Sequence, residues 1–217
     1  VLRLVLLNVL IVVPSFSLFI IYSAINKSGN NHLTFLLLIP MLLWLFPSIV
    51  ATTDVIRQYE NKETNTIFKD FFKSIKKLYL KSFIISIFVY LGIGLFWNSL
   101  SFFLNNATKG SLYIICFNYT ASFAMAFVLV LSQIPLVICY FKKMGILQIL
   151  KLSFIFAFKN IGINLIIAFC ILGFGFIDAI TTYAMALGGF SLPIYIMVKL
   201  SFKQYIRIYR KVEENEN

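Results

Sequence analysis

Six long apolar stretches dominate the pattern of hydrophobic and polar positions along the chain. A helix needs about 20 apolar residues to cross the hydrocarbon core of a bilayer, and each stretch meets or approaches that length. The pattern therefore predicts an all-α fold, a polytopic transmembrane helical bundle. The predicted spans cover residues 4–24, 34–52, 80–104, 112–140, 161–182 and 183–200, and residues 201–217 form a predicted cytoplasmic tail.

The sixth stretch has an alternative interpretation. Gly188, Gly189 and Pro193 interrupt it, and broken helices at membrane depth also occur in re-entrant segments. The alternative is that the last two stretches form a single span and one re-entrant segment.

The polar connection after the second predicted span carries its own helical pattern. In residues 64–81, apolar residues recur at helical spacing with lysines between them, and Thr66 or Asn65 is a plausible N-cap. We expect a basic amphipathic cytoplasmic helix that leads into the third span. It would lie on anionic lipid or form a docking surface for a partner. Its candidate contact residues are Phe68, Lys69, Phe71, Phe72, Lys73, Lys76 and Lys77.

A second, weaker copy of this pattern precedes the fifth predicted span. Lys151 and Lys159 flank a short apolar stretch of helical spacing. The two halves of the chain could thus be related hairpins, each with a cytoplasmic elbow, as in transporter folds built from internal repeats.

Composition favours a membrane protein over a soluble one. Of the 217 residues, 60% are hydrophobic and 12% are charged, whereas soluble domains are about half apolar and about a quarter charged. The length suits one domain over residues 1–217. The chain begins with Val1 rather than Met, so we expect further residues before it.

The net charge of +11 is distributed unevenly. If the N-terminus is cytoplasmic, 17 of the 19 Lys and Arg residues fall in cytoplasmic segments, and only Lys27 and Lys109 fall outside. This asymmetry predicts that both termini are cytoplasmic and that the number of spans is even. The positive charge then indicates how the chain is oriented in the membrane and where it contacts membrane lipid. We expect no nucleic-acid partner.

Polar residues inside the predicted spans are candidates for function. An ionisable side chain is costly in the membrane, so Asp178 could bind a cation, carry a proton or contact a sugar hydroxyl. Alternatively it lies hydrated near the outer interface. Gln133 and Asn164 complete the candidate polar site, although buried amides more often join helices by hydrogen bonds.

Motifs that would indicate an enzyme are missing from the sequence. It contains no G-x-x-x-x-G-K-[ST], no H-E-x-x-H and no G-x-S-x-G. The three cysteines lie in apolar runs without a CxxC pair, and His32 is the single histidine. We therefore expect no enzymatic activity, no cofactor and no metal.

Four segments resemble the YesL-like membrane proteins, a domain of unknown function found widely in Gram-positive bacteria. The resemblance covers nearly the whole chain in order. The segments are residues 6–10 (LLNVL) followed by Pro14, residues 47–57 (PSIVATTDVIR), residues 66–72 (TIFKDFF) leading into 80–83 (LKSF), and residues 187–195 (LGGFSLPIY). The resemblance implies a location in the bacterial plasma membrane and an association with carbohydrate-uptake systems of the ABC type.

Two functional hypotheses follow. The first is an accessory or scaffold subunit associated with a carbohydrate importer, with ABC importer subunits as its partners. We do not expect the chain to be the ABC permease itself, because it lacks a recognisable EAA-type coupling loop. The second is a small transporter for a sugar or another small solute, in which Asp178 and the broken sixth stretch line a path.

Overall fold

The computed structural model describes residues 3–13, 31–61, 66–159, 161–180 and 189–216. Within these ranges it does not describe the side chains of residues 31–43, 97, 109, 172, 174–180, 202–204 and 207–216. Every regular element in the described ranges is helical. After an N-terminal helix Arg3–Val13, the elements are α2 (Asn31–Glu60), α3 (Ile67–Asn105), a 3-10 turn (Ala107–Lys109), α4 (Ser111–Tyr140), α5 (Ile146–Lys159), α6 (Ile161–Ile180) and α8 (Ser191–Glu216).

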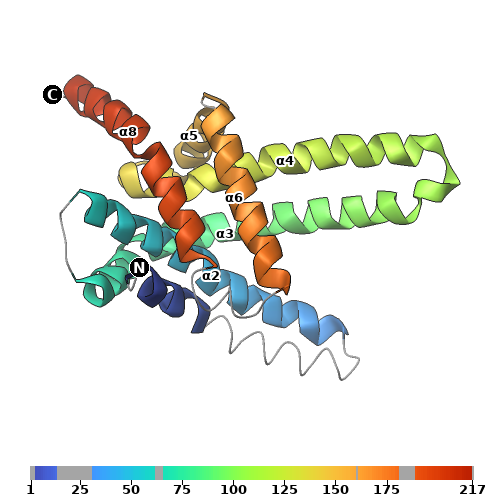
Figure 1. Cartoon of the computed structure of the whole chain (residues 1–217), viewed down its shortest axis with the longest axis horizontal. Coiled ribbons are helices and arrows are strands. Elements are labelled where there is room, and N and C mark those ends of the chain that lie inside the picture. The colour runs from blue at the N-terminus through green and yellow to red at the C-terminus, as the bar shows by residue number, and fades with distance from the viewer. Residues whose placement is uncertain (1–2, 14–30, 62–65, 160, 181–188, 217) are drawn as a thin grey trace.

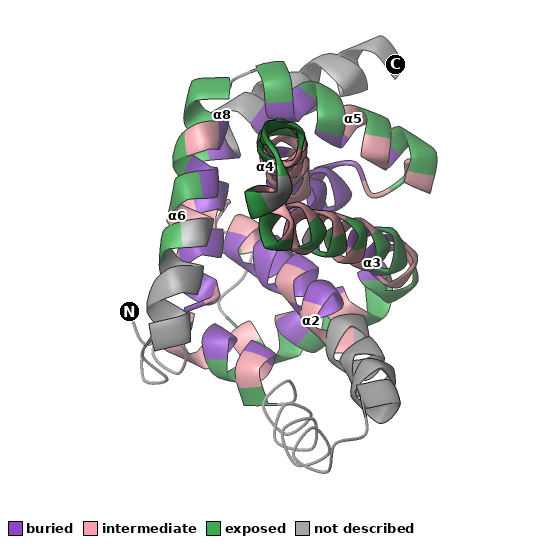
Figure 2. Ribbon diagram, turned by 90° about the vertical axis from the view of Figure 1, so that its right-hand side faces the viewer, coloured by how far each residue is buried: buried purple, intermediate pink, exposed green. Residues whose placement is uncertain are grey.

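Helices α3 and α4 form a long antiparallel hairpin, and its far half extends beyond the other helices (Figure 1). The core lies at the opposite end, where α2 ends, α3 begins and α4 ends. In α4 the buried residues are Leu129 and residues 132–140 only. Figure 2 looks along the hairpin and shows α5 and α6 lying across its axis rather than beside it. The packed helices therefore gather around one end of the hairpin.

The helices agree with a membrane protein, but the predicted six spans stay a prediction. Among the described residues, α3 and α4 are each long and apolar enough to cross a bilayer. Helix α5 with residues 161–171 would be a third span only as a bent pair. The predicted spans 34–52, 80–104 and 112–140 fall inside α2, α3 and α4. Much of the first predicted span and residues 183–188 of the sixth lie outside the described residues.

The helix predicted after the second span has no elbow before the third span. Residues 67–105 form one continuous helix of 39 residues, because the apolar positions of its basic part continue in register into the span. The backbone instead turns sharply between α5 and α6, which are bent by 103° at the break near residue 160. The bend therefore follows the weaker of the two amphipathic patterns, the one flanked by Lys151 and Lys159, and not the one in residues 64–81.

The predicted cytoplasmic tail continues the last helix. Helix α8 runs from Ser191 to Glu216, and Tyr205 within it is fully buried. Its ring stacks on Tyr140 at the end of α4, with centroids 5.1 Å apart. The first part of the tail is therefore packed against the core.

Candidate functional site

A buried carboxylate, Asp54, holds together the end of the molecule where the core lies. It sits near the end of α2, just after the second predicted span, with its side chain only 2% exposed. Arg57, one turn later, donates from Nε and Nη2 to its Oδ1 at 3.2 and 2.9 Å. Lys142, in the turn after α4, donates to Oδ2 at 3.0 Å and lies 2.8 Å from Oδ1. One carboxylate thus pairs with two cations.

Neutral donors complete the shell around Asp54. Gln58 Nε2 and Ser74 Oγ each donate to Asp54 Oδ2 at 2.9 Å. Ser74 comes from α3, so the carboxylate joins α2, α3 and the turn after α4. A buried carboxylate requires such compensation, since an unpaired charge in an apolar interior costs several kcal/mol.

The charges set the protonation state of Asp54. Burial by itself raises the pKa of this carboxyl. The hydrogen bond from Lys142, the charges of Arg57 and Lys142, and the hydrogen bond from Ser74 outweigh burial and hold its pKa below the usual value. Asp54 is therefore ionised at neutral pH.

A second lysine fastens the same turn. Lys81 Nζ donates to the carbonyl oxygens of Lys142 at 2.5 Å and Met144 at 2.8 Å. These carbonyls belong to the turn between α4 and α5. Lys81 thus ties this turn to α3. We call Asp54, Arg57, Ser74, Lys81 and Lys142 the ionic cluster.

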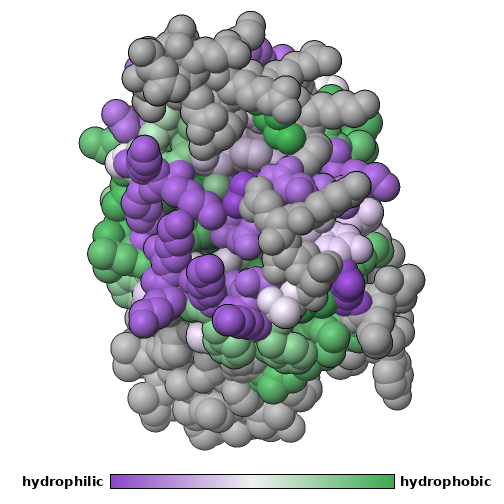
Figure 3. All heavy atoms as spheres, turned by 90° about the vertical axis from the view of Figure 1, so that its left-hand side faces the viewer, coloured by the Kyte–Doolittle hydropathy of each residue, from purple (hydrophilic) through white to green (hydrophobic). Residues whose placement is uncertain are grey.

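The ionic cluster lies behind a strongly polar face. Figure 3 shows the end of the molecule where α2 ends and α3 begins, with hydrophilic residues across its centre and apolar surface at its sides. The described residues contain no group of three or more His, Cys, Asp or Glu side chains able to hold a metal ion. The ion pairs and hydrogen bonds of Asp54 hold three chain segments together.

The structure joins two of the three predicted intramembrane candidates. Gln133 Nε2 donates to Asn164 Oδ1 at 3.1 Å, and Tyr205 Oη donates to Gln133 Oε1 at 3.0 Å. Asn164 Nδ2 donates to the carbonyls of Phe156 and Ala157, in the last turn of α5, at 2.7 and 2.8 Å. These amides join α4, α5, α6 and α8, which fits the helix-joining interpretation. The third candidate, Asp178, lies in α6, and its side chain is outside the described residues.

Asn8, from the first segment of the resemblance, also has a structural partner. Its Oδ1 accepts the backbone N–H groups of Phe190 and Ser191 at 3.0 and 3.3 Å. These donors lie at the start of α8, so Asn8 caps that helix from the N-terminal helix.

The candidate contact residues at the start of α3 divide into two groups. Phe71 is fully buried in the core, so it does not belong to the exposed contact set predicted from the sequence. Phe68 and Phe72 are 52% and 53% exposed. The four lysines of the set are exposed too: Lys69, Lys73, Lys76 and Lys77. Together with Phe68 and Phe72 they form the surface that we call the α3 basic face.

An apolar cavity of about 380 Å³ lies between the helices. Its only hydroxyl side chains, Ser86 and Ser132, donate to carbonyls of their own helices, those of Phe83 and Leu129. Among the residues whose side chains the structure describes, the lining is almost entirely apolar and includes no charged side chain. Its lining residues are Leu45, Phe46, Ile49, Ser86, Val89, Ile93, Val128, Leu131, Ser132, Pro135, Ile171, Gly189, Phe190, Pro193, Ile194 and Met197.

Part of the chain is similar to a known protein family. A family model for a protein of unknown function, DUF624, matches residues 4–100. This region is similar to that family and contains Asn8, Asp54, Arg57 and Ser74, whereas Lys142 and the Gln133–Asn164 pair lie beyond it. No curated protein and no solved structure matches the chain. The match supports a domain of unknown function and leaves the more specific YesL-like resemblance an expectation.

Proposed function

We propose that this chain is an accessory or scaffold subunit of a membrane complex and that the α3 basic face is its docking surface. The length of α3 carries the proposal. At about 1.5 Å per residue its 39 residues reach about 58 Å, whereas the hydrocarbon core is about 30 Å thick. Because the lysines of α3 lie at its start, this end is the part that extends into the cytoplasm.

A continuous helix changes which partner the α3 basic face fits. An interfacial helix lies along the membrane surface, but residues 67–80 belong to the same unbroken helix as the predicted third span. Phe68 and Phe72 therefore lie on the part of α3 that extends beyond the lipid. Exposed aromatic side chains are enriched at protein interfaces. The matching partner is a protein surface with apolar pockets and acidic side chains.

The ionic cluster supports a docking role for the α3 basic face. Ser74 and Lys81 belong to the opposite side of the same helix and bind Asp54 and the turn after α4. Phe71, one turn before Ser74, is buried in the core. The exposed side of α3 is thus presented on a fixed support, which lowers the entropy lost when a partner binds.

The resemblance to YesL-like proteins suggests subunits of a carbohydrate ABC importer as the partner. The test is recovery of those subunits with the tagged full-length chain, in mild detergent, from cells growing on glycans. We expect F68A/F72A to reduce recovery at least severalfold. F88A is the matched control, because Phe88 is 55% exposed on α3 within the predicted third span.

Two results would count against the docking proposal. Failure to recover any importer subunit with the unaltered chain would remove the proposed partner. Equal recovery with F68A/F72A and F88A would show that the α3 basic face is not the docking surface.

The cavity favours a second candidate function, a small membrane transporter. Gly189 and Pro193, from the broken sixth stretch, contribute to its lining. However, the apolar lining suits an apolar solute better than a sugar. Replacing Asp178 with Asn tests this candidate, since a proton- or cation-coupled path through this residue predicts loss of uptake. Unchanged uptake by a folded D178N protein removes the support that Asp178 provides.

A further inference from the structure

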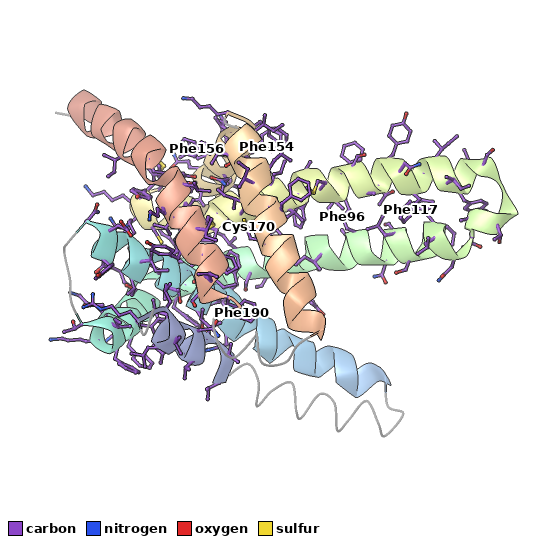
Figure 4. All side chains as sticks on the ribbon, viewed as in Figure 1. Phe96, Phe117, Phe154, Phe156, Cys170 and Phe190 are labelled. Atoms are coloured by element: carbon purple, nitrogen blue, oxygen red, sulfur yellow. The ribbon has the colours of Figure 1, made fainter. Side chains whose placement is uncertain are left out.

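Helix α5 has two opposite faces of different character. Its inner face is buried and includes Ile149, Ser153 and Phe156. Phe156 packs against Tyr205 of α8, with ring centroids 4.7 Å apart. Figure 4 labels Phe156 on the α8 side of α5 and Phe154 on the other side. The opposite, outer face of α5 carries exposed side chains.

The outer face of α5 exposes large apolar side chains in one stripe. Leu147 is 82%, Phe154 58% and Phe158 40% exposed. They are spaced seven and four residues apart, which places them on one side of a helix. The rings of Phe154 and Phe158 lie 4.9 Å apart. In water, such a stripe would be costly.

Lysines lie within and beside this stripe. Lys151 and Lys159 are exposed on α5, and Lys143 is exposed in the turn before it. At 100° per residue, Lys151 lies within the stripe, between Leu147 and Phe154, and Lys159 lies at its edge, about 100° from Phe158. The outer face thus combines large apolar side chains with lysines whose apolar stems can extend along it.

The direction of α5 suits contact with a membrane surface. It begins just after the basic end of the hairpin and lies across the hairpin axis (Figure 2). A helix with this direction runs along the membrane surface when the hairpin crosses the bilayer. Its apolar stripe then reaches the acyl boundary while its lysines reach the headgroups.

We propose that α5 is an interfacial helix that binds anionic phospholipid on the cytoplasmic leaflet, with Leu147, Phe154 and Phe158 in the acyl boundary and Lys143, Lys151 and Lys159 at the headgroup phosphates. Anionic headgroups fit better than zwitterionic ones, because three exposed cations gather there and the cytoplasmic leaflet is negatively charged. This binding is independent of the docking proposed for the α3 basic face.

Photo-crosslinking of the full-length chain tests the proposal. A benzophenone amino acid replaces Phe154 in protein reconstituted into vesicles of equal parts phosphatidylglycerol and phosphatidylcholine. After irradiation, the intact mass identifies the lipid class attached. We expect phosphatidylglycerol adducts to predominate. The same probe at the buried Phe156 is the matched control and should give no lipid adduct. A probe at Phe158, on the same stripe, repeats the test if the first variant does not fold.

Removing one lysine tests the headgroup preference. One cation near an anionic surface contributes about 1 kcal/mol, so K151Q should lower the ratio of phosphatidylglycerol to phosphatidylcholine adducts about fivefold. K73Q removes a lysine from the α3 basic face and should leave the ratio unchanged. The proposal is overturned if the adducts follow the vesicle composition, or if the probe at Phe154, irradiated in cells, attaches to another protein rather than to lipid.

Discussion

At the scale of single residues, Asp54 shows how much a buried charge can organise. Its partners lie 3, 4, 20 and 88 residues away in the chain. The local partners could be anticipated from helical spacing. Ser74 and Lys142 could not, since only the packing of α2, α3 and α4 brings them near. For this reason the sequence pattern does not separate Asp54 from an exposed helix-end carboxylate.

Replacing Asp54 by Asn should destabilise the fold by about 3 kcal/mol, because it leaves two partly buried cations without their counter-charge. Thermal unfolding in detergent, followed by circular dichroism, measures the change. D70N is the matched control: Asp70 is a partly exposed carboxylate in the first turn of α3 that accepts from Thr66, and its loss should cost about 1 kcal/mol or less. Equal stability of D54N and D70N would contradict the role given to the ionic cluster.

The pH dependence of stability should carry the signature of Asp54. Its pKa is lowered in the folded state, so its stabilisation is complete above the usual carboxyl pKa of about 4 and is lost as the pH falls below that value. We expect the unfolding temperatures of the unaltered protein and of D54N to converge as the pH is lowered through the acidic range below about 4. A constant difference across that range would argue against an ionised Asp54.

At the scale of elements, the ends of a helix do not coincide with the ends of the predicted membrane span within it. The sequence locates α4 closely, with residues 112–140 predicted and Ser111–Tyr140 found. It starts the third span at residue 80, whereas the helix begins at Ile67. Hydropathy marks where a helix enters lipid, not where its hydrogen bonds begin. Hydropathy likewise does not locate the elbow between α5 and α6, because capping of the end of α5, rather than composition, determines where the backbone turns.

Asn164 holds that elbow by capping the end of α5. Its Nδ2 donates to the carbonyls of Phe156 and Ala157, and N164A leaves these buried acceptors without that donor. We expect a loss of about 1 to 3 kcal/mol and faster hydrogen exchange in residues 146–171 than elsewhere. N118A, at an exposed position of α4, is the control. Uniform exchange changes along the whole chain would show that Asn164 does not act on the elbow in particular.

Gly92 marks the close contact between α3 and α4. A Cβ at this position would lie 2.4 Å from Cζ of Phe127, whereas a Cβ at Gly94 would meet nothing within 4 Å. G94A should stabilise the helix by up to about 1 kcal/mol through helix propensity. G92A should gain less or lose stability, since the Phe127 ring must move. The comparison uses thermal unfolding of both variants, and equal gains would show that the hairpin contact is loose.

At the scale of the whole molecule, the α3–α4 hairpin has two different ends. One end carries the ionic cluster, the α3 basic face and α5, and the other end is the turn near Lys109 (Figure 1).

If the basic end is cytoplasmic, Lys109 faces outward and Lys143 inward. Cysteines placed there in a background with Cys116, Cys139 and Cys170 replaced by Ser or Ala distinguish the two ends. We expect a membrane-impermeant maleimide to label K109C in intact cells and K143C only after permeabilisation. The reverse labelling would invert the topology and place the α3 basic face where no cytoplasmic partner could reach it. Labelling of both in intact cells would show that the hairpin does not cross the bilayer.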